Sequence, residues 1–204
     1  TMGHVRAGQE VFESEIVESG FQKQSERADL LEENYFVVFT RSGKGGLSEL
    51  QYPIIAGYGG AAKVADSALS AQPGRKVILD VTAGGDASAV NKGLDRAARL
   101  LNIYGLAGRK ASDVNITVVL HGEATRSILA EDFYAARFGV ESNPNLPLVT
   151  ALRDAGVQVY VCGQALNYKG FRSTSVADSV SIADAALTVI IESQAAGAAY
   201  IPVP

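Results

Sequence analysis

Cysteine is almost absent from this chain, and its scarcity limits the chemistry that the chain can hold. Among 204 residues only Cys162 is a cysteine, so no disulfide can form within the chain. A structural zinc site needs clustered Cys and His ligands, and only two histidines occur, His4 and His121. We therefore expect the fold to be stabilised by neither disulfides nor a structural metal.

The sequence also lacks a cluster of basic residues and a long hydrophobic run. Its net charge is −4, which argues against binding to nucleic acid or to an anionic membrane surface. No apolar stretch approaches the length of a membrane-spanning helix. Hydrophobic residues make up 47% and charged residues 20%, a balance that supports a packed core in one domain, with or without an extension.

The first third of the chain lacks a regular pattern. Residues 9–34 are polar and mostly acidic, which is typical of a solvated arm or an irregular helix. Residues 35–40 are aromatic and β-branched and predict a strand. Residues 51–73 are rich in glycine and alanine with little periodicity. We predict that residues 1–73 form an N-terminal extension, with room for a short hairpin of its own.

From residue 74 to residue 204 the pattern becomes regular. Apolar segments of strand length alternate with helical segments, which is typical of βαβ units and a parallel sheet. We therefore predict a three-layer α/β/α sandwich with a mostly parallel sheet of about five strands. The predicted strands are 76–81, 115–121, 157–162, 179–182 and 199–203, and the predicted helices are 88–104, 124–138, 146–155 and 183–196.

Cys162 lies where a predicted strand breaks at a Cys-Gly step and opens into a helical segment. In open α/β sheets, ligands bind outside the carboxyl ends of the strands, and a helix N-terminus favours the reactive thiolate form of a cysteine. The alternative is that Cys162 is a small apolar residue that only fills the core. Its position alone leaves both interpretations open.

A second group of candidates follows the strand predicted at 115–121. His121 would lie at the same edge of the sheet as Cys162, where an imidazole is the base that a thiol nucleophile needs. Gly122 and Glu123 come next, and Glu123 either orients the ring or favours a helix start. Asn143 either lines the same pocket or forms part of a loop with a helix cap. A purely structural, hydrogen-bonded His121 remains the alternative.

Two glycine-rich segments suggest other ligands. Residues 57–62 fit G-x-G-x-x-A, and Asp80 follows at a strand end, as in dinucleotide-binding folds. Pro53 and the short segment that follows weaken this match, because the fingerprint requires a strand, a turn and a helix. Residues 82–86 could bind an anion at a helix N-terminus or simply form a turn capped by Ser88. No G-x-S-x-G motif of a serine hydrolase is present.

Three stretches of the C-terminal part resemble the DsrE/DsrF-like family, which includes sulfur-relay subunits and the YchN-like group. The resemblance covers roughly residues 75–204. Its most specific part is the Cys162-Gly163 step with Leu166 four residues after the cysteine, followed by Lys169-Gly170. The three stretches are 118–122, 156–166 and 183–203.

The resemblance implies an α/β/α fold, no organic cofactor, and homo- or hetero-oligomers, trimers and hexamers among them. In sulfur-relay members a cysteine at the sheet edge carries a persulfide, and the matching residue here is Cys162. This implies a sulfur carrier that accepts sulfane sulfur on Cys162 and exchanges it with a donor or acceptor protein. His121 would assist, and the backbone N–H groups of Gly163 and Gln164 would stabilise the sulfur. The alternative is a non-catalytic oligomeric module that binds a small ligand or is structural.

The first residues look like a cloning remnant around a start. If they are one, the natural N-terminus has been trimmed, and a signal peptide could have been lost with it. Longer members of the family with this shape often look exported. We therefore predict a periplasmic protein, with the cytoplasm as the alternative.

Overall fold

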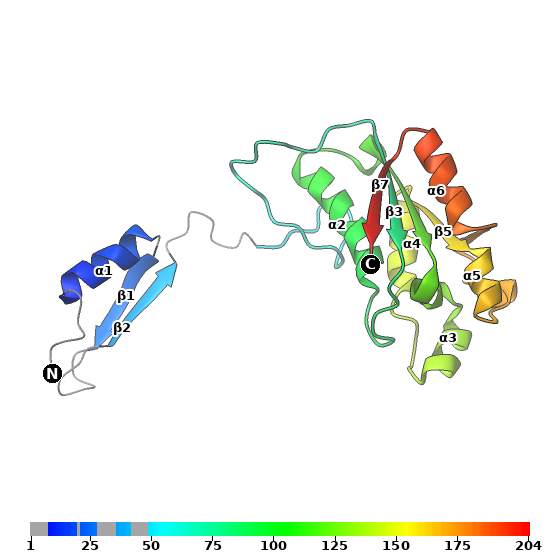
Figure 1. The fold of residues 1–204 in the computed structure, drawn as a ribbon, viewed down its shortest axis with the longest axis horizontal. Helices are drawn as coiled ribbons and strands as arrows, with labels where there is room; N and C mark the ends of the chain where they lie inside the picture. The colour runs from blue at the N-terminus through cyan, green and yellow to red at the C-terminus, as the bar shows by residue number, and fades with distance from the viewer. Residues whose placement is uncertain (1–7, 20, 28–35, 42–48) are drawn as a thin grey trace. The chain divides into compact units, whose positions relative to one another are not determined.

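The computed structural model describes residues 8–19, 21–27, 36–41 and 49–204, and it divides into two compact units, Thr1–Glu49 and Leu50–Pro204 (Figure 1). His4 and Tyr35 lie outside the described residues. Within the described ranges, no helix combines the length and the apolar character that crossing a membrane requires.

The N-terminal unit contains a helix, α1 (Gln9–Glu18), and an antiparallel pair of strands, β1 (Phe21–Arg27) and β2 (Phe36–Arg41). The prediction of an arm or irregular helix for residues 9–34 is therefore wrong for β1. Although the sequence of β1 is polar, pairing with the apolar β2 decides its conformation, because strand formation depends strongly on the neighbouring strand. Lys23 on β1 also forms an ion pair with Glu13 on α1 at 2.8 Å.

Residues 50–73 belong with the α/β unit, whereas the sequence analysis placed them in the extension. Asn102, on α2 (Lys92–Leu106), is fully buried and connects this segment to the domain. Its side-chain oxygen accepts the N–H groups of Ile54 and Ile55 at 2.9 Å each, and its nitrogen donates to the carbonyl of Gly59 at 3.0 Å. Since this segment has no strand or helix of its own, Asn102 satisfies backbone groups that would otherwise be buried without partners.

The dinucleotide interpretation of residues 57–62 is wrong. This segment consists of turns and an isolated bridge between Gln51 and Ala61, and no helix follows it. Gly59 has a φ of +59°, and a Cβ there would lie 2.1 Å from the backbone nitrogen of Arg99. The glycines therefore allow a close approach to α2, and the strand–turn–helix geometry that a pyrophosphate requires is missing.

Gly59→Ala should consequently destabilise the α/β unit by about 2–3 kcal/mol, because the new Cβ clashes with backbone and the left-handed conformation disfavours alanine. The matched control is Gly74→Ala, where φ is +77° and no atom lies within 4 Å of the added Cβ. That variant should lose only about 1 kcal/mol. Urea unfolding of both variants measures the difference, and equal losses would show that the contact with α2 does not matter.

The five strands of the α/β unit form one parallel sheet, as predicted, and their order in the sheet is β6-β5-β4-β3-β7. From β3 to β6 the chain moves across the sheet in one direction, and it then returns to place β7 beside β3. A connection between two parallel strands of one sheet is right-handed. The connection from β6 back to β7 runs in the opposite direction to the earlier ones, so its helix, α6, lies on the opposite face of the sheet from α2. Figure 1 accordingly shows α2 and α6 on opposite sides of the strands. The elements are β3 (Arg75–Val81), β4 (Val114–Leu120), α3 (Glu131–Phe138), α4 (Leu146–Asp154), β5 (Gln158–Cys162), α5 (Gly163–Tyr168), β6 (Ser181–Ala183), α6 (Ala186–Ala195) and β7 (Ala199–Val203), with 3₁₀ turns at Ala111–Asp113, Gly122–Ile128 and Ser173–Ser175.

Two predicted helices have different boundaries in the structure. The helix expected from Ser88 begins after Asn91, whose side chain accepts the N–H of Gly93 at 2.8 Å and is the N-cap. Ser88 instead donates its hydroxyl and its backbone N–H to Asp86 in the preceding turn. The helix expected at 124–138 is divided into a 3₁₀ turn and α3.

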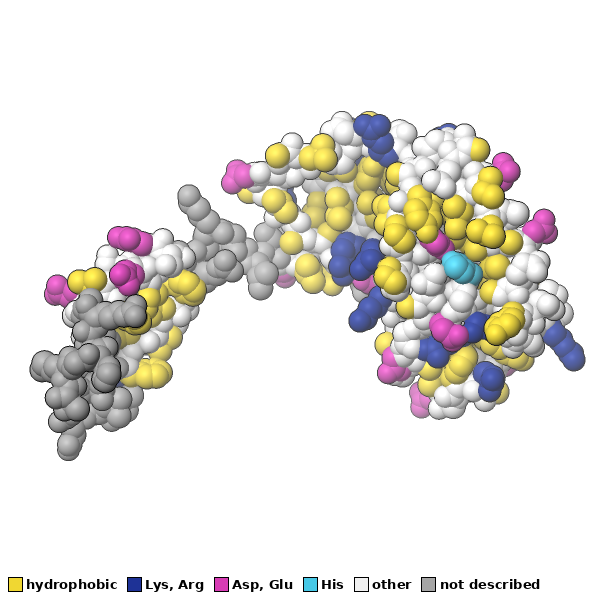
Figure 2. Space-filling model, in the orientation of Figure 1, with side chains coloured by type: hydrophobic (Ala, Val, Ile, Leu, Met, Phe, Trp, Pro, Cys, Tyr) yellow, Lys and Arg dark blue, Asp and Glu magenta, His cyan; other side chains and the backbone are white. Residues whose placement is uncertain are grey.

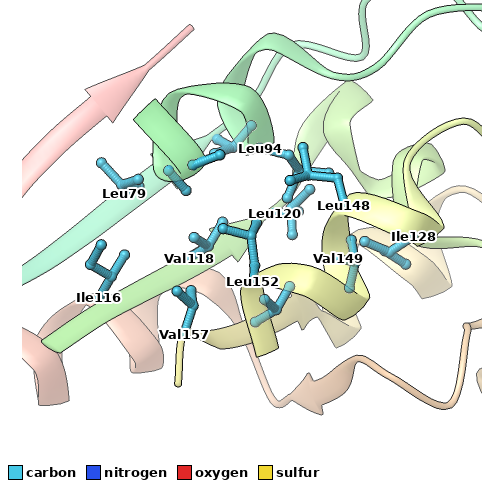
Figure 3. Close-up of a cluster of buried hydrophobic side chains, with 14 of the residues drawn as sticks. Leu79, Leu94, Ile116, Val118, Leu120, Ile128, Leu148, Val149, Leu152 and Val157 are labelled. Carbon is cyan, nitrogen blue, oxygen red and sulfur yellow. The ribbon is translucent and has the colours of Figure 1, made fainter. Parts of the chain in front are cut away.

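The core is strongly asymmetric between the two faces of the sheet. On the face covered by α2 and α4, leucine and valine side chains of the sheet and of both helices interlock (Figure 3). On the face covered by α6, the cluster of buried residues is small and consists of Ile78, Val119, Cys162 and Ala186. A single ten-residue helix covers this face, so the α6 face has room for a pocket.

Candidate functional site

The carboxyl ends of three neighbouring strands bring Asp80, His121 and Cys162 to one edge of the sheet. Asp80 is the penultimate residue of β3, His121 follows β4, and Cys162 ends β5. Leu120 pairs with Val161, so one further step along these parallel strands places His121 beside Cys162. Because side chains alternate between the two faces of a sheet, all three point to the α6 face.

Asp80 holds His121 through a short hydrogen bond. The imidazole Nε2 lies 2.7 Å from Oδ1 of Asp80, and the hydroxyl of Tyr200 donates to Oδ2 at 2.7 Å. This hydrogen bond, followed by burial, raises the pKa of the Tyr200 phenol, because a bond to the carboxylate favours the protonated hydroxyl. Among the described residues, Nδ1 of His121 has no hydrogen-bond partner. The hydrogen bond at Nε2 therefore fixes the orientation of the ring, and Nδ1 is available to accept or donate a proton.

Cys162 is 6% exposed and packs against Ile78, Val119 and Ala186. Its Sγ accepts the backbone N–H of Ala165 at 3.4 Å, so the thiol caps the N-terminus of α5. The thiol nevertheless lines a pocket of about 550 Å³ at the edge of the sheet. The residues that line this pocket, hereafter the thiol pocket, are Asp80, His121, Cys162, Gln164, Ala185, Ala186, Leu187, Ile190, Gln194 and Tyr200.

The walls of the thiol pocket are mainly apolar. The first turn of α6 and the residue before it contribute Ala185, Ala186 and Leu187, and Ile190 lies one turn further along. Figure 2 shows the histidine at the surface of the α/β unit, bordered by hydrophobic side chains. A cysteine thiol, a hydrogen-bonded imidazole and apolar walls are a combination that suits nucleophilic attack with little competition from water.

Of the glycines and the glutamine predicted for the site, only Gln164 lines the thiol pocket, and Gly122 and Gly163 directly follow His121 and Cys162 in the chain. Gly122 has a φ of +56° and turns the chain directly after His121. A Cβ on Gly163 would lie 2.8 Å from the carbonyl oxygen of Ala183, so only glycine permits this approach to β6. Gln164 lines the pocket and donates to the carbonyl of Asp184 at 3.2 Å.

Two further predicted residues, Glu123 and Asn143, do not line the thiol pocket either. Glu123 is exposed and pairs with Lys169 at 2.6 Å, and the hydrogen bond to Lys169 lowers the pKa of its carboxyl group. Asn143 is buried and donates to the carbonyls of Ser127 and Leu129 at 3.1 and 2.7 Å. Their contacts make Glu123 part of a surface ion pair and Asn143 a support for a loop.

A second hollow, of about 580 Å³, lies at the opposite ends of the strands under the same helix. Polar groups such as Lys76, Thr117 and Gln158 line it, and Thr117 and Gln158 are hydrogen-bonded to each other at 3.3 Å. Neither the cysteine nor the histidine of the α/β unit lines it. The two candidate catalytic residues, Cys162 and His121, therefore both line the thiol pocket and not this hollow.

Two residues of the site were not predicted from the sequence: Asp80 as the partner of His121, and Tyr200 in any role. A lone carboxylate near the end of an apolar strand was a signal for Asp80, since buried charges are usually paired. Tyr200 carried no such signal. It reaches Asp80 only because β7 lies beside β3, and that neighbour is not encoded in any local pattern.

These features define an α/β protein with a cysteine thiol and a histidine at the carboxyl ends of a parallel sheet. The model of the DsrE/DsrF-like family matches residues 76–203, and the chain belongs to this family. Among solved structures, the chain is similar to the protein of unknown function MTH1491 from Methanobacterium thermoautotrophicum. That match has 19% identity and a TM-score of 0.46, and it covers 63% of this chain and 99% of the other. No curated protein matches the chain.

Proposed function

We propose that this protein is a sulfur carrier that accepts sulfane sulfur as a persulfide on Cys162. One observation carries the proposal: the only cysteine of the chain lines a pocket together with His121, and a buried carboxylate holds that histidine. Cysteine, imidazole and carboxylate in this order are the arrangement that activates a thiol in unrelated enzymes. Membership of the DsrE/DsrF-like family agrees with this chemistry.

The proposed reaction needs no oxidant. His121 takes the thiol proton, and the thiolate of Cys162 attacks the sulfane sulfur of the donor. A bond forms between the two sulfurs while the donor's own bond to that sulfur breaks, and the leaving group departs with the electron pair and takes up the proton from the imidazolium. The Ala165 N–H already bonded to Sγ stabilises the anionic sulfur, and the N–H groups of Gly163 and Gln164 begin the same helical turn.

Loading with sulfur tests the proposal directly. Incubation with a sulfane-sulfur donor should raise the intact mass of the native protein by one sulfur atom, and a reducing thiol should remove it. Cys162→Ser should gain nothing, because no second cysteine is present. Absence of the adduct in the native protein, or an equal adduct in Cys162→Ser, would reject the sulfur-carrier role.

The burial of Cys162 supports a second candidate, a non-catalytic oligomeric module in which the thiol only fills the pocket wall. Alkylation of the native and the unfolded protein separates the two. A carrier thiol should react in the native state faster than a free cysteine at the same pH, whereas a filler should react only after unfolding.

The carrier needs partners, because a chain with one cysteine cannot resolve its own persulfide. We propose a donor or acceptor protein for this transfer and a homo-oligomer, a trimer or a hexamer, as the working form. Exposed apolar side chains on α6 support association, since Leu187 is 70% and Ile191 is 60% exposed. Light scattering of the purified chain measures the assembly. The periplasmic location stays a prediction, which fractionation of cells that express the natural gene would test.

A further inference from the structure

The thiol pocket contains little positive charge to attract an anion. Among the described residues that line it there is no Lys or Arg, and the charged groups are the carboxylate of Asp80 and the imidazole of His121. Asp80 is only 7% exposed, and it can at most balance the charge of a protonated His121. An inorganic dianion such as thiosulfate would therefore enter the pocket without the cationic partners that a buried charge requires.

The pocket is also larger than an inorganic donor needs. Its volume is about 550 Å³, whereas an apolar cavity of about 150 Å³ already accommodates benzene. Leu187 and Ile190 are three residues apart on α6 and so lie on the same side of the helix. Together with Ala186 they form an apolar wall above the thiol, and an apolar group bound to the donor sulfur would lose water against this wall.

We propose that the thiol pocket takes sulfane sulfur from organosulfur donors, in which an apolar group carries the sulfur, in preference to inorganic donors. This inference rests on the proposed function and specifies its substrate class. With a thiosulfonate anion as donor, the Cys162 thiolate attacks the terminal sulfur. The new sulfur–sulfur bond forms, the bond to the sulfonyl sulfur breaks, and the electron pair leaves on the sulfinate. A persulfide anion and a sulfinate result, and because a sulfinate is a weak base, the thiol proton stays on the imidazolium of His121.

The test compares three donors on the full chain by the rate of persulfide formation in intact-mass measurements. Benzenethiosulfonate and methanethiosulfonate have the same charge and differ only in the apolar group, and thiosulfate replaces that group by a charged oxygen. Each rate is divided by the rate at which the same donor reacts with N-acetylcysteine, so that the intrinsic reactivity of the donor does not affect the comparison. We expect benzenethiosulfonate to exceed methanethiosulfonate about tenfold, from burial of the ring, and thiosulfate to be the slowest.

Variants of α6 connect the preference to the pocket wall. Leu187→Ser should reduce the advantage of benzenethiosulfonate to about threefold or less, because the ring loses part of its apolar contact. Ile191→Ser is the matched control on the same helix, since Ile191 is similarly exposed but does not line the pocket. This control should retain the full preference, whatever its effect on assembly.

Each outcome bears on a different claim. If thiosulfate, once normalised, loads Cys162 as fast as benzenethiosulfonate, the organosulfur inference is wrong and the sulfur-carrier role stands. If Leu187→Ser and Ile191→Ser change the preference equally, the wall formed by α6 does not select the donor, and the inference is again wrong. If no donor loads Cys162, the proposed function and this inference both fail.

Discussion

Replacement of His121 by alanine should slow the alkylation of native Cys162 near neutral pH on the order of tenfold to a hundredfold. The thiolate is the reactive form of cysteine, and in the proposed function His121 takes the proton of the thiol and, once protonated, stabilises the negative sulfur. The measurement is the rate of iodoacetamide modification as a function of pH. At high pH, where alkylation no longer depends on a base in the protein, the two proteins should react at similar rates.

Substitution of Asp80 tests whether the charge of this carboxylate, and not only its packing, contributes to the reactivity of Cys162. Asp80→Asn keeps the size of the side chain and removes the charge that faces Nε2 of His121. It should therefore slow the alkylation of Cys162 less than His121→Ala does, with the same recovery of the rate at high pH.

Tyr200→Phe removes the hydroxyl group that donates to Asp80. It should leave the alkylation rate within about twofold, because this hydrogen bond is one step further from the thiol. A uniform slowing at every pH in His121→Ala would instead indicate restricted access to Cys162.

Asn102→Ala should lower the free energy of unfolding by about 3–5 kcal/mol, the largest stability loss that we expect from a single polar residue here. Asn102 is fully buried, and its amide accepts two backbone N–H groups and donates to three carbonyls in the segment at 54–59. Alanine leaves these groups buried without partners, and each unsatisfied group costs stability. Urea denaturation measures the loss.

The matched control for Asn102 is Asn167→Ala on α5, where the asparagine is exposed and its replacement should cost less than about 0.5 kcal/mol. Limited proteolysis gives a second measure, because the segment at 50–73 should be cleaved faster in Asn102→Ala than in the parent chain. A similar stability of the two variants would mean that the segment at 54–59 does not depend on Asn102.

The regular part of the fold was predictable because its strands are locally distinctive. Apolar runs such as residues 76–81 and 115–121 report burial on both faces of a sheet, and this signal does not depend on distant residues. The strand β1 was not predictable, because its polar sequence becomes a strand only by pairing with β2. The segment at 50–73 was misplaced for a similar reason, since it is held by a side chain more than forty residues away in the sequence.

For the candidate site, the sequence by itself determined which residues could carry chemistry. A single cysteine and His121, each at the end of a buried strand, were enough to predict one edge of the sheet, because parallel strands bring their carboxyl ends together. Only the tertiary structure decided the partners. The return of the chain to place β7 beside β3 brings Tyr200 to Asp80, and the right-handed crossover places α6 alone over the thiol. These are long-range consequences of strand order, and no local pattern of residues encodes them.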